Sequence, residues 1–146
     1  MTKLRSWPLI SILLLLLGCA TVPITGRSQL SMIKNSELIP MSFQQYEEVL
    51  KANEISENNT QATLIKKVGV KIQKAVETYL EKEGQSEVLN DFEWEFNLIE
   101  DKTVNAWCMP GGKVAFYTGI LPVCQGEKGI AVVMGHEIAH AIANHG

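Results

Sequence analysis

The chain has 146 residues, of which 46% are hydrophobic and 20% are charged, and its formal net charge is −3 at pH 7. This length is enough for one small domain with a single core. Residues 1–18 contain two cations, Lys3 and Arg5, and no acid, so the remaining chain has 11 Lys and Arg against 16 Asp and Glu, a net charge of −5. This acidic balance argues against nucleic acid as a partner and against membrane docking through basic residues.

The first eighteen residues have the pattern of a secretion signal. Their basic start is followed by a nine-residue apolar run, 9–17, which is interrupted only by Ser11. As a helix this run spans about 14 Å, which is too short to cross the hydrocarbon core of a bilayer. The run ends in Leu16-Leu17-Gly18-Cys19, which resembles the bacterial lipobox, where the cysteine sulfur is acylated and becomes the new N-terminus.

We therefore expect a lipoprotein signal at 1–18, lipidation at Cys19, and attachment to the lipid bilayer through the acyl chains. A plain signal peptide or an uncleaved anchor are the alternatives. The lipobox implies the bacterial cell envelope, with the chain facing the periplasm. Ala20 is not the aspartate that retains some lipoproteins at the inner membrane, so we favour the outer membrane.

Two long helices are expected after a tether. Residues 19–35 contain Pro, Gly and several Ser and Thr without periodicity, which is typical of a linker. Ser36 can cap a helix that ends at about Ala52, and Thr60 can cap a second helix to about Glu83. The second helix has apolar residues at steps of three and four, which predicts a face packed into a core. We expect residues 36–146 to form the N-terminal part of a larger domain.

Three strands are expected next. From Phe92 to Leu98, aromatic and aliphatic residues alternate with polar ones, which predicts a half-buried strand. Strands at 104–109 and 113–118 flank Pro110-Gly111-Gly112, whose glycines we interpret as turn residues rather than substrate contacts. We expect a small antiparallel sheet.

Two cysteines lie in this part of the chain, Cys108 in the second predicted strand and Cys124 in a predicted loop. The envelope permits disulfides, so they could pair. We prefer two free, buried thiols.

The most informative feature is His136-Glu137-Ile138-Ala139-His140, an H-E-x-x-H sequence in a strongly apolar predicted helix from Gly126 onward. Residues four apart on a helix are rotated by about 40° and separated by about 6 Å along the axis, so both imidazoles leave the same face and can bind one zinc ion. Glu137 then lies beside them as a general base. The alternative is that the histidines are core residues with Glu137 as their hydrogen-bond partner. Two histidines and a glutamate in a helix that is apolar around its circumference favour the metal, because unpartnered buried polar groups are costly.

His145 does not extend this motif. It lies five residues after His140, about 140° around the helix, and it comes one residue too early for the H-E-x-x-H-x-x-G-x-x-H pattern, where Ala143 replaces the glycine. We expect His145 to be a helix C-terminal residue that interacts with the helix dipole.

Two segments carry a resemblance to a known family. The first is 105–113 with 117–121, and the second is 133–140 with 144–146. Both resemble the gluzincin-type zinc metallopeptidases that include the C-a-a-X prenyl protease, HtpX, the OMA-type protease and BepA. The lipobox is similar to that of the bacterial lipoprotein branch. The resemblance implies an α+β, zincin-like fold, of which this chain is the N-terminal half: two helices, a small antiparallel sheet and a buried H-E-x-x-H helix.

The resemblance also implies chemistry. His136 and His140 would bind one Zn²⁺ per full-length subunit, with Glu137 as the general base on zinc-bound water. The family's third ligand is a glutamate on a later helix, which this chain does not contain. The strand after the glycine turn would be an edge that aligns extended substrate by β-addition. Its residues are Lys113, Val114, Ala115, Phe116 and Tyr117. An ordinary sheet edge is the alternative for that strand.

We therefore expect a fragment of a longer enzyme, truncated after its motif helix and lacking the C-terminal helices. The full enzyme would be a zinc endopeptidase that hydrolyses unfolded or misassembled envelope proteins in quality control. The chain alone would bind zinc weakly, show little or no peptidase activity, and expose an apolar helix face. The alternative function is a non-catalytic periplasmic lipoprotein with a holdase or assembly role.

Overall fold

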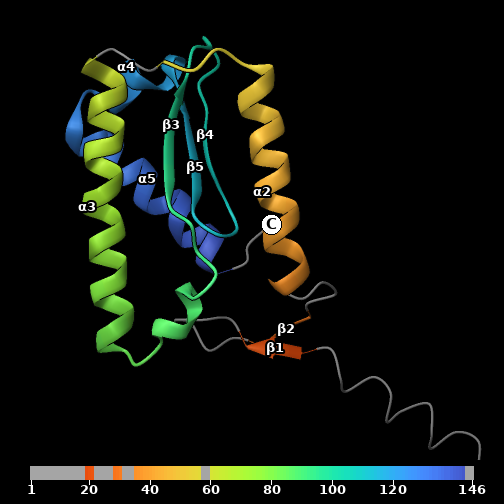
Figure 1. Ribbon diagram of the computed structural model, residues 1–146. Helices are drawn as coiled ribbons and strands as arrows, with labels where there is room; N and C mark the ends of the chain where they lie inside the picture. Colours follow the sequence, from red (N-terminus) through yellow and green to blue (C-terminus); the bar gives the residue numbers. More distant parts are fainter. Residues whose placement is uncertain (1–18, 22–27, 31–34, 57–59, 144–146) are drawn as a thin grey trace, which may run out of the picture.

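A three-stranded sheet with helices on both faces forms the centre of the protein (Figure 1). The computed structural model describes residues 19–21, 28–30, 35–56 and 60–143. The strands are β3 (Glu95–Ile99), β4 (Ala106–Met109) and β5 (Lys113–Tyr117), in the spatial order β3-β5-β4. Among the described residues, no helix is both long enough and apolar enough to span a bilayer.

The helices form two layers around this sheet. α2 (Asn35–Ala52) covers one face, and α3 (Thr60–Lys82) with α5 (Glu127–Ile142) covers the other (Figure 1). Three short helices lie in the connections between the longer elements. η2 (Ser86–Leu89) lies between α3 and β3, and η3 (Thr118–Ile120) and α4 (Leu121–Cys124) lie between β5 and α5. The predicted α+β class and all three long helices are confirmed. β1 (Cys19–Thr21) and β2 (Ser28–Leu30) pair as a separate antiparallel ribbon within the segment expected to be a tether.

The main core lies between the sheet, α3 and α5. The predicted stripe of α3 provides its buried side chains, and Gly69 lies on that same face. A Cβ atom at Gly69 would lie 2.4 Å from the Phe96 ring of β3. Glycine therefore allows the helix to approach the sheet at this point.

The sheet is mixed rather than antiparallel, because β3 and β5 run parallel while β4 and β5 run antiparallel. The expectation that Lys113–Tyr117 form an edge strand is wrong, since β5 is the central strand. Its first four residues are buried, and each of them is paired with both β3 and β4. An apolar strand is most stable where both of its faces are covered, and in this fold that position is the middle of the sheet. The edges are β3 and β4, and β4 is half-buried throughout.

A tight turn joins β4 to β5. The amide of Gly112 donates to the carbonyl of Met109 at 3.2 Å, and Gly111 has φ +89° after Pro110. Proline followed by a residue with positive φ is the arrangement of a type II turn, which requires glycine at that position. A Cβ atom at Gly111 would also lie 2.4 Å from the Phe43 ring of α2. The turn role expected for these glycines is confirmed.

A polar network joins α2 to its face of the sheet. The Tyr46 hydroxyl donates to the carbonyl of Val114 and accepts from the Asn97 side chain. Asn97 also donates to Glu95, which pairs with Lys113 at 3.3 Å. A smaller apolar cluster surrounds this network. Its members are Tyr46, Val49, Leu50, Ile55, Ile99, Trp107, Met109, Ala115 and Tyr117.

Several local expectations need correction. β3 begins at Glu95 rather than at Phe92. Phe92 and Trp94 lie before the strand, and their rings pack against each other as a tilted pair. Cys124 ends the short helix α4 instead of lying in a loop. Both thiols are free as expected, but only Cys124 is buried, because Cys108 lies on the half-buried edge strand β4. α5 is not buried all round, since Val132 is 74% exposed. The predicted signal at 1–18 and His145 lie outside the described residues.

Candidate metal centre

The H-E-x-x-H motif lies near the C-terminal end of α5. This helix starts after Gly126, whose φ of +112° turns the chain out of the preceding helix, and it runs to Ile142. Its buried stripe packs against the sheet and α3. The buried residues are Ile130, Met134, Ile138, Ala141 and Ile142. Because His136 lies two positions before Ile138, it is directed away from this stripe and is exposed.

The two histidines converge as their spacing predicts. The Nε2 atoms of His136 and His140 are 2.9 Å apart, and the rings are nearly perpendicular with centroids separated by 4.4 Å. His136 is exposed and His140 is half-buried. The two nitrogens are therefore within hydrogen-bonding distance of each other, and the tautomers decide which one donates.

This pair fits zinc. Two imidazole nitrogens bound to one tetrahedral zinc ion at about 2.1 Å lie roughly 3.4 Å apart, so a small rotation of the side chains would bring the observed pair to that spacing. Neutral imidazole is a ligand that zinc prefers. Within the described ranges, no group of three His, Cys, Asp or Glu residues is arranged to hold a metal ion. The described residues thus offer two candidate ligands, whereas a catalytic zinc needs three from protein.

Glu137 lies on the side of α5 that faces β4. It is half-buried, and its negative charge acts on Cys108 of β4. Burial is the main cause that raises the pKa of Cys108, to about 12, and the Glu137 carboxylate adds to it. The Glu137 carboxylate is therefore close enough to the Cys108 thiol of β4 to act on it electrostatically.

The outer edge of β4 is available for backbone pairing. The carbonyl of Asn105 accepts from the amide of Tyr117 at 3.1 Å, which makes that residue pair hydrogen-bonded across the β4–β5 ladder. Because hydrogen-bonded and non-bonded pairs alternate in an antiparallel ladder, the amides and carbonyls of Ala106 and Cys108 point away from β5. In the described part of the chain, no strand pairs with β4 on that side. β4, rather than β5, is the edge next to the motif.

The upstream acids have structural roles. Glu127 pairs with Lys67 at 3.0 Å and also with Lys71, and hydrogen bonds from Lys71 and Lys67 lower the pKa of this carboxyl. Asp101 accepts a hydrogen bond from the amide of Thr103 at 2.7 Å, and the Thr103 side-chain and backbone bonds lower the pKa of Asp101. Within the part of the chain that the structure describes, neither acid joins the histidine pair in a group of three residues that could hold a metal ion.

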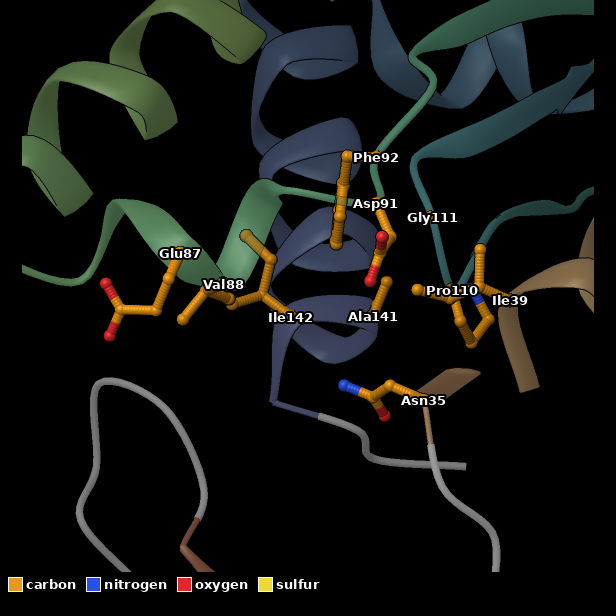
Figure 2. A pocket seen from close by; sticks show the side chains of 10 residues that line it. All are labelled: Asn35, Ile39, Glu87, Val88, Asp91, Phe92, Pro110, Gly111, Ala141 and Ile142. Atoms are coloured by element: carbon orange, nitrogen blue, oxygen red, sulfur yellow. The ribbon is translucent and has the colours of Figure 1, made fainter. Parts of the chain in front are cut away.

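A pocket of about 120 Å³ lies beyond the motif, at the C-terminal end of α5 (Figure 2). Ala141 and Ile142 form one wall, Pro110 lies opposite, and the carboxylate of Asp91 points into the space between them (Figure 2). None of the three motif residues lines this pocket. The histidine pair instead lies on an open helix face.

The sequence identified the motif residues but not the role of β4. Ala106 to Met109 were expected as a strand, without any sign that this strand is the edge beside Glu137. The residue types carry little signal of it, because strand order depends on pairing between distant segments.

Comparison with known proteins finds relatives that are named as metalloendopeptidases or as a protease. The chain is 51% identical over 57 residues to the mitochondrial metalloendopeptidase OMA1 of Schizosaccharomyces pombe. The aligned region covers 39% of the chain and 17% of that protein. It is 28% identical over 126 residues to the OMA1 metalloendopeptidase of Bos taurus, covering 84% of the chain and 23% of the relative. It is 42% identical over 50 residues to a putative beta-barrel assembly-enhancing protease of Vibrio cholerae, covering 34% of the chain and 10% of the relative.

The chain thus spans less than a quarter of the length of these relatives. The family model described as Peptidase family M48 matches residues 66–146, more than half of the chain, from α3 through the end of the motif helix. The matched region contains the whole sheet and both converging histidines, which agrees with the gluzincin resemblance of the two segments. The chain belongs to peptidase family M48.

Proposed function

We propose that this chain is the part of a zinc-dependent endopeptidase that supplies two metal ligands, the general base and the substrate-aligning strand. The observation that carries the proposal is the 2.9 Å convergence of the His136 and His140 Nε2 atoms on the helix that packs beside the free edge of β4. The metalloendopeptidase names of the relatives support it. A third ligand would come from outside the described residues.

In this proposal, each part of the candidate site has a role in peptide hydrolysis. Zinc, when bound, would polarise both the attacking water and the scissile carbonyl. Glu137 would accept a proton from that water and return it to the leaving amine, as a half-buried carboxylate next to the site can do. The outward amides and carbonyls of Ala106 and Cys108 would pair with extended substrate, holding its backbone beside Glu137. Backbone pairing of this kind gives broad specificity and suits unfolded protein segments.

We also propose a cellular location and a class of substrates for this protein. Residues 1–18 would direct export, Cys19 would carry the lipid, and the segment to residue 35 would lead to a domain that begins at residue 36. The substrates would be misfolded proteins of a bacterial envelope. Support comes from the lipobox and from similarity to the Vibrio cholerae protein.

The catalytic proposal is tested with the natural full-length protein. Casein should be digested, digestion should stop with a chelator, and Glu137→Gln should lower the rate at least about a hundredfold while zinc content stays equal. Glu77→Gln makes the same charge change on the outer side of α3 and should leave the rate unchanged. Unchanged cleavage by Glu137→Gln contradicts the mechanism.

A second candidate is a non-catalytic lipoprotein that holds unfolded proteins. The exposed Val132 on α5 and the free edge of β4 favour it, because both could bind extended apolar chains. Absence of zinc from the full-length protein, together with suppression of aggregation of an unfolded client, would support this alternative. Cys19→Ser tests the proposed location for both candidates, since it should release the protein from membranes.

A further inference from the structure

The two faces of the edge strand β4 meet different surroundings. Side chains alternate along a strand, and Cys108 faces α5 and its Glu137. Trp107 and Met109 therefore lie on the opposite face, where they join the cluster beneath α2. All four β4 residues are half-buried, so this second face is also open at the edge of the sheet.

Trp107 is held firmly in this position. Its ring meets Tyr46 of α2 edge-on, with centroids 5.7 Å apart and an interplanar angle of 87°. Its indole N–H donates to the Tyr117 hydroxyl at 3.4 Å, and its partner across the ladder is the small Ala115. A fixed, half-exposed indole can bind another side chain at a low cost in conformational entropy.

A peptide paired with the outer side of β4 must place its side chains on the same two faces. Neighbouring residues level with each other on adjacent strands direct their side chains to the same side, with Cβ atoms about 5 Å apart. The substrate residue level with Trp107 therefore meets the indole. The residues before and after it face α5 and Glu137 instead.

We propose that Trp107 and Met109 form a specificity surface that selects a large apolar or aromatic side chain at one substrate position, on the face of β4 away from the metal helix. The proposal rests on the proposed endopeptidase function. It assigns the substrate class more narrowly, as extended segments with a bulky apolar residue at that position.

The chemistry of the surface favours this class. The indole N–H already has a partner in Tyr117, so the exposed part of Trp107 is apolar. The neighbouring cation, Lys113, is paired with Glu93 and Glu95 and lies 4.6 Å from the Phe43 ring centroid. A charged substrate side chain would find no counter-ion in Trp107 and Met109 themselves, and it would lose hydration on contact with them.

The test uses the natural full-length protein loaded with zinc and a library of ten-residue peptides that vary one position at a time. We expect the wild-type protein to prefer Phe, Trp or Leu over Ser and Asp at one position, by about fivefold in kcat/KM. Trp107→Ala should reduce that preference to near unity at this position only. The matched control, Val49→Ala, removes an apolar side chain from the same cluster on α2 and should keep the preference.

The outcomes separate the two proposals. Chelator-sensitive cleavage with the same profile in wild type and Trp107→Ala overturns the specificity surface and leaves the endopeptidase standing. No cleavage of any peptide by the wild-type protein overturns both. Should Trp107→Ala fail to fold, Trp107→Leu keeps apolar cover over Ala115, and an unchanged ratio of aromatic to aliphatic substrates in that variant overturns the proposal.

Discussion

The hydroxyl of Tyr46 in α2 donates a hydrogen bond to the main-chain carbonyl of Val114 in β5 at 3.0 Å, across 68 residues of sequence. Tyr46 is 1% exposed. This bond, together with the one that Tyr46 accepts from Asn97, fixes α2 on the face of the sheet opposite α5. The ring of Tyr46 supports Trp107, so the same residue links the N-terminal helix to the edge strand.

We predict that Tyr46→Phe lowers the free energy of unfolding by about 1 kcal/mol, because one buried hydrogen bond is lost while the ring and its packing remain. Denaturant unfolding followed by circular dichroism measures this change. Tyr79→Phe is the matched control, since Tyr79 is 47% exposed on α3 and should change stability little. Equal effects of the two substitutions would show that the Tyr46 bond contributes nothing.

Gly69 should not tolerate alanine. The added Cβ atom would meet the Phe96 ring at 2.4 Å, so we expect Gly69→Ala to destabilise the fold by about 1–3 kcal/mol through overpacking, in spite of its better helix propensity. Gly135→Ala is the control, because a Cβ atom there meets nothing within 4 Å. That variant should be as stable as wild type or up to about 1 kcal/mol more stable. Thermal unfolding of both variants compares them, and a stabilised Gly69→Ala would contradict the close approach of α3 to β3.

Zinc binding by the 146-residue chain should depend on both histidines. Two ligands give weak binding, and we expect His136→Ala or His140→Ala to weaken it at least about tenfold further. Glu137→Gln should retain it, because we propose Glu137 as the general base and not as a zinc ligand. Titration with zinc against a competing chelating dye measures the affinity. Undiminished binding in the double variant His136→Ala/His140→Ala would show that the ion binds elsewhere.

Cys108 should react slowly with alkylating reagents in the folded protein. Burial and the nearby Glu137 carboxylate raise its pKa from 9.0 to about 12, so the reactive thiolate is scarce near neutral pH. The raised pKa also makes stability depend on pH. Above pH 9 the unfolded chain loses the Cys108 proton while the folded protein keeps it, so the contribution of this thiol to stability is lost as the pH rises from 9 toward 12. Iodoacetamide labelling at about pH 8, with and without denaturant, measures the difference in a Cys19→Ser/Cys124→Ala background. Equal labelling rates in the two conditions would contradict the burial of Cys108.

The Glu127 ion pairs should contribute to stability only above acidic pH. Hydrogen bonds and charges from Lys71 and Lys67 lower the pKa of this carboxyl below 4.5, so the contribution is present above that value and is lost as the pH falls through the folded-state pKa. Glu127→Gln should therefore melt slightly below wild type at neutral pH and together with it in acid. Glu77→Gln, whose carboxylate accepts from Gln73, should melt like wild type throughout. A Glu127→Gln deficit that persists in acid would contradict the ion-pair origin.

Much of the fold was predictable because its signals are local. The apolar steps in α3 predicted a helix from Thr60 to about Glu83, and the structure has Thr60–Lys82. The glycines after Pro110 predicted the turn between β4 and β5, and Gly111 has the positive φ that such a turn requires. The parallel pairing of β3 with β5 could not be predicted in this way, since it joins strands eighteen residues apart in register, from Glu95 with Lys113 onward. No local pattern distinguishes that pairing from a simple meander.

In the candidate site, too, one part follows from local sequence and another part depends on the tertiary structure. The sequence alone determined the histidine pair, because the geometry of an α-helix brings residues four apart onto one face wherever the helix lies, and His136 and His140 converge accordingly. Only the tertiary structure decided which strand lies at the edge beside them. Placing β5 in the centre buried its apolar residues on both faces and left β4, with Trp107 on one side and Cys108 on the other, as the free edge next to Glu137. That choice depends on which distant segments bury the most apolar surface together, and no short stretch of sequence contains it.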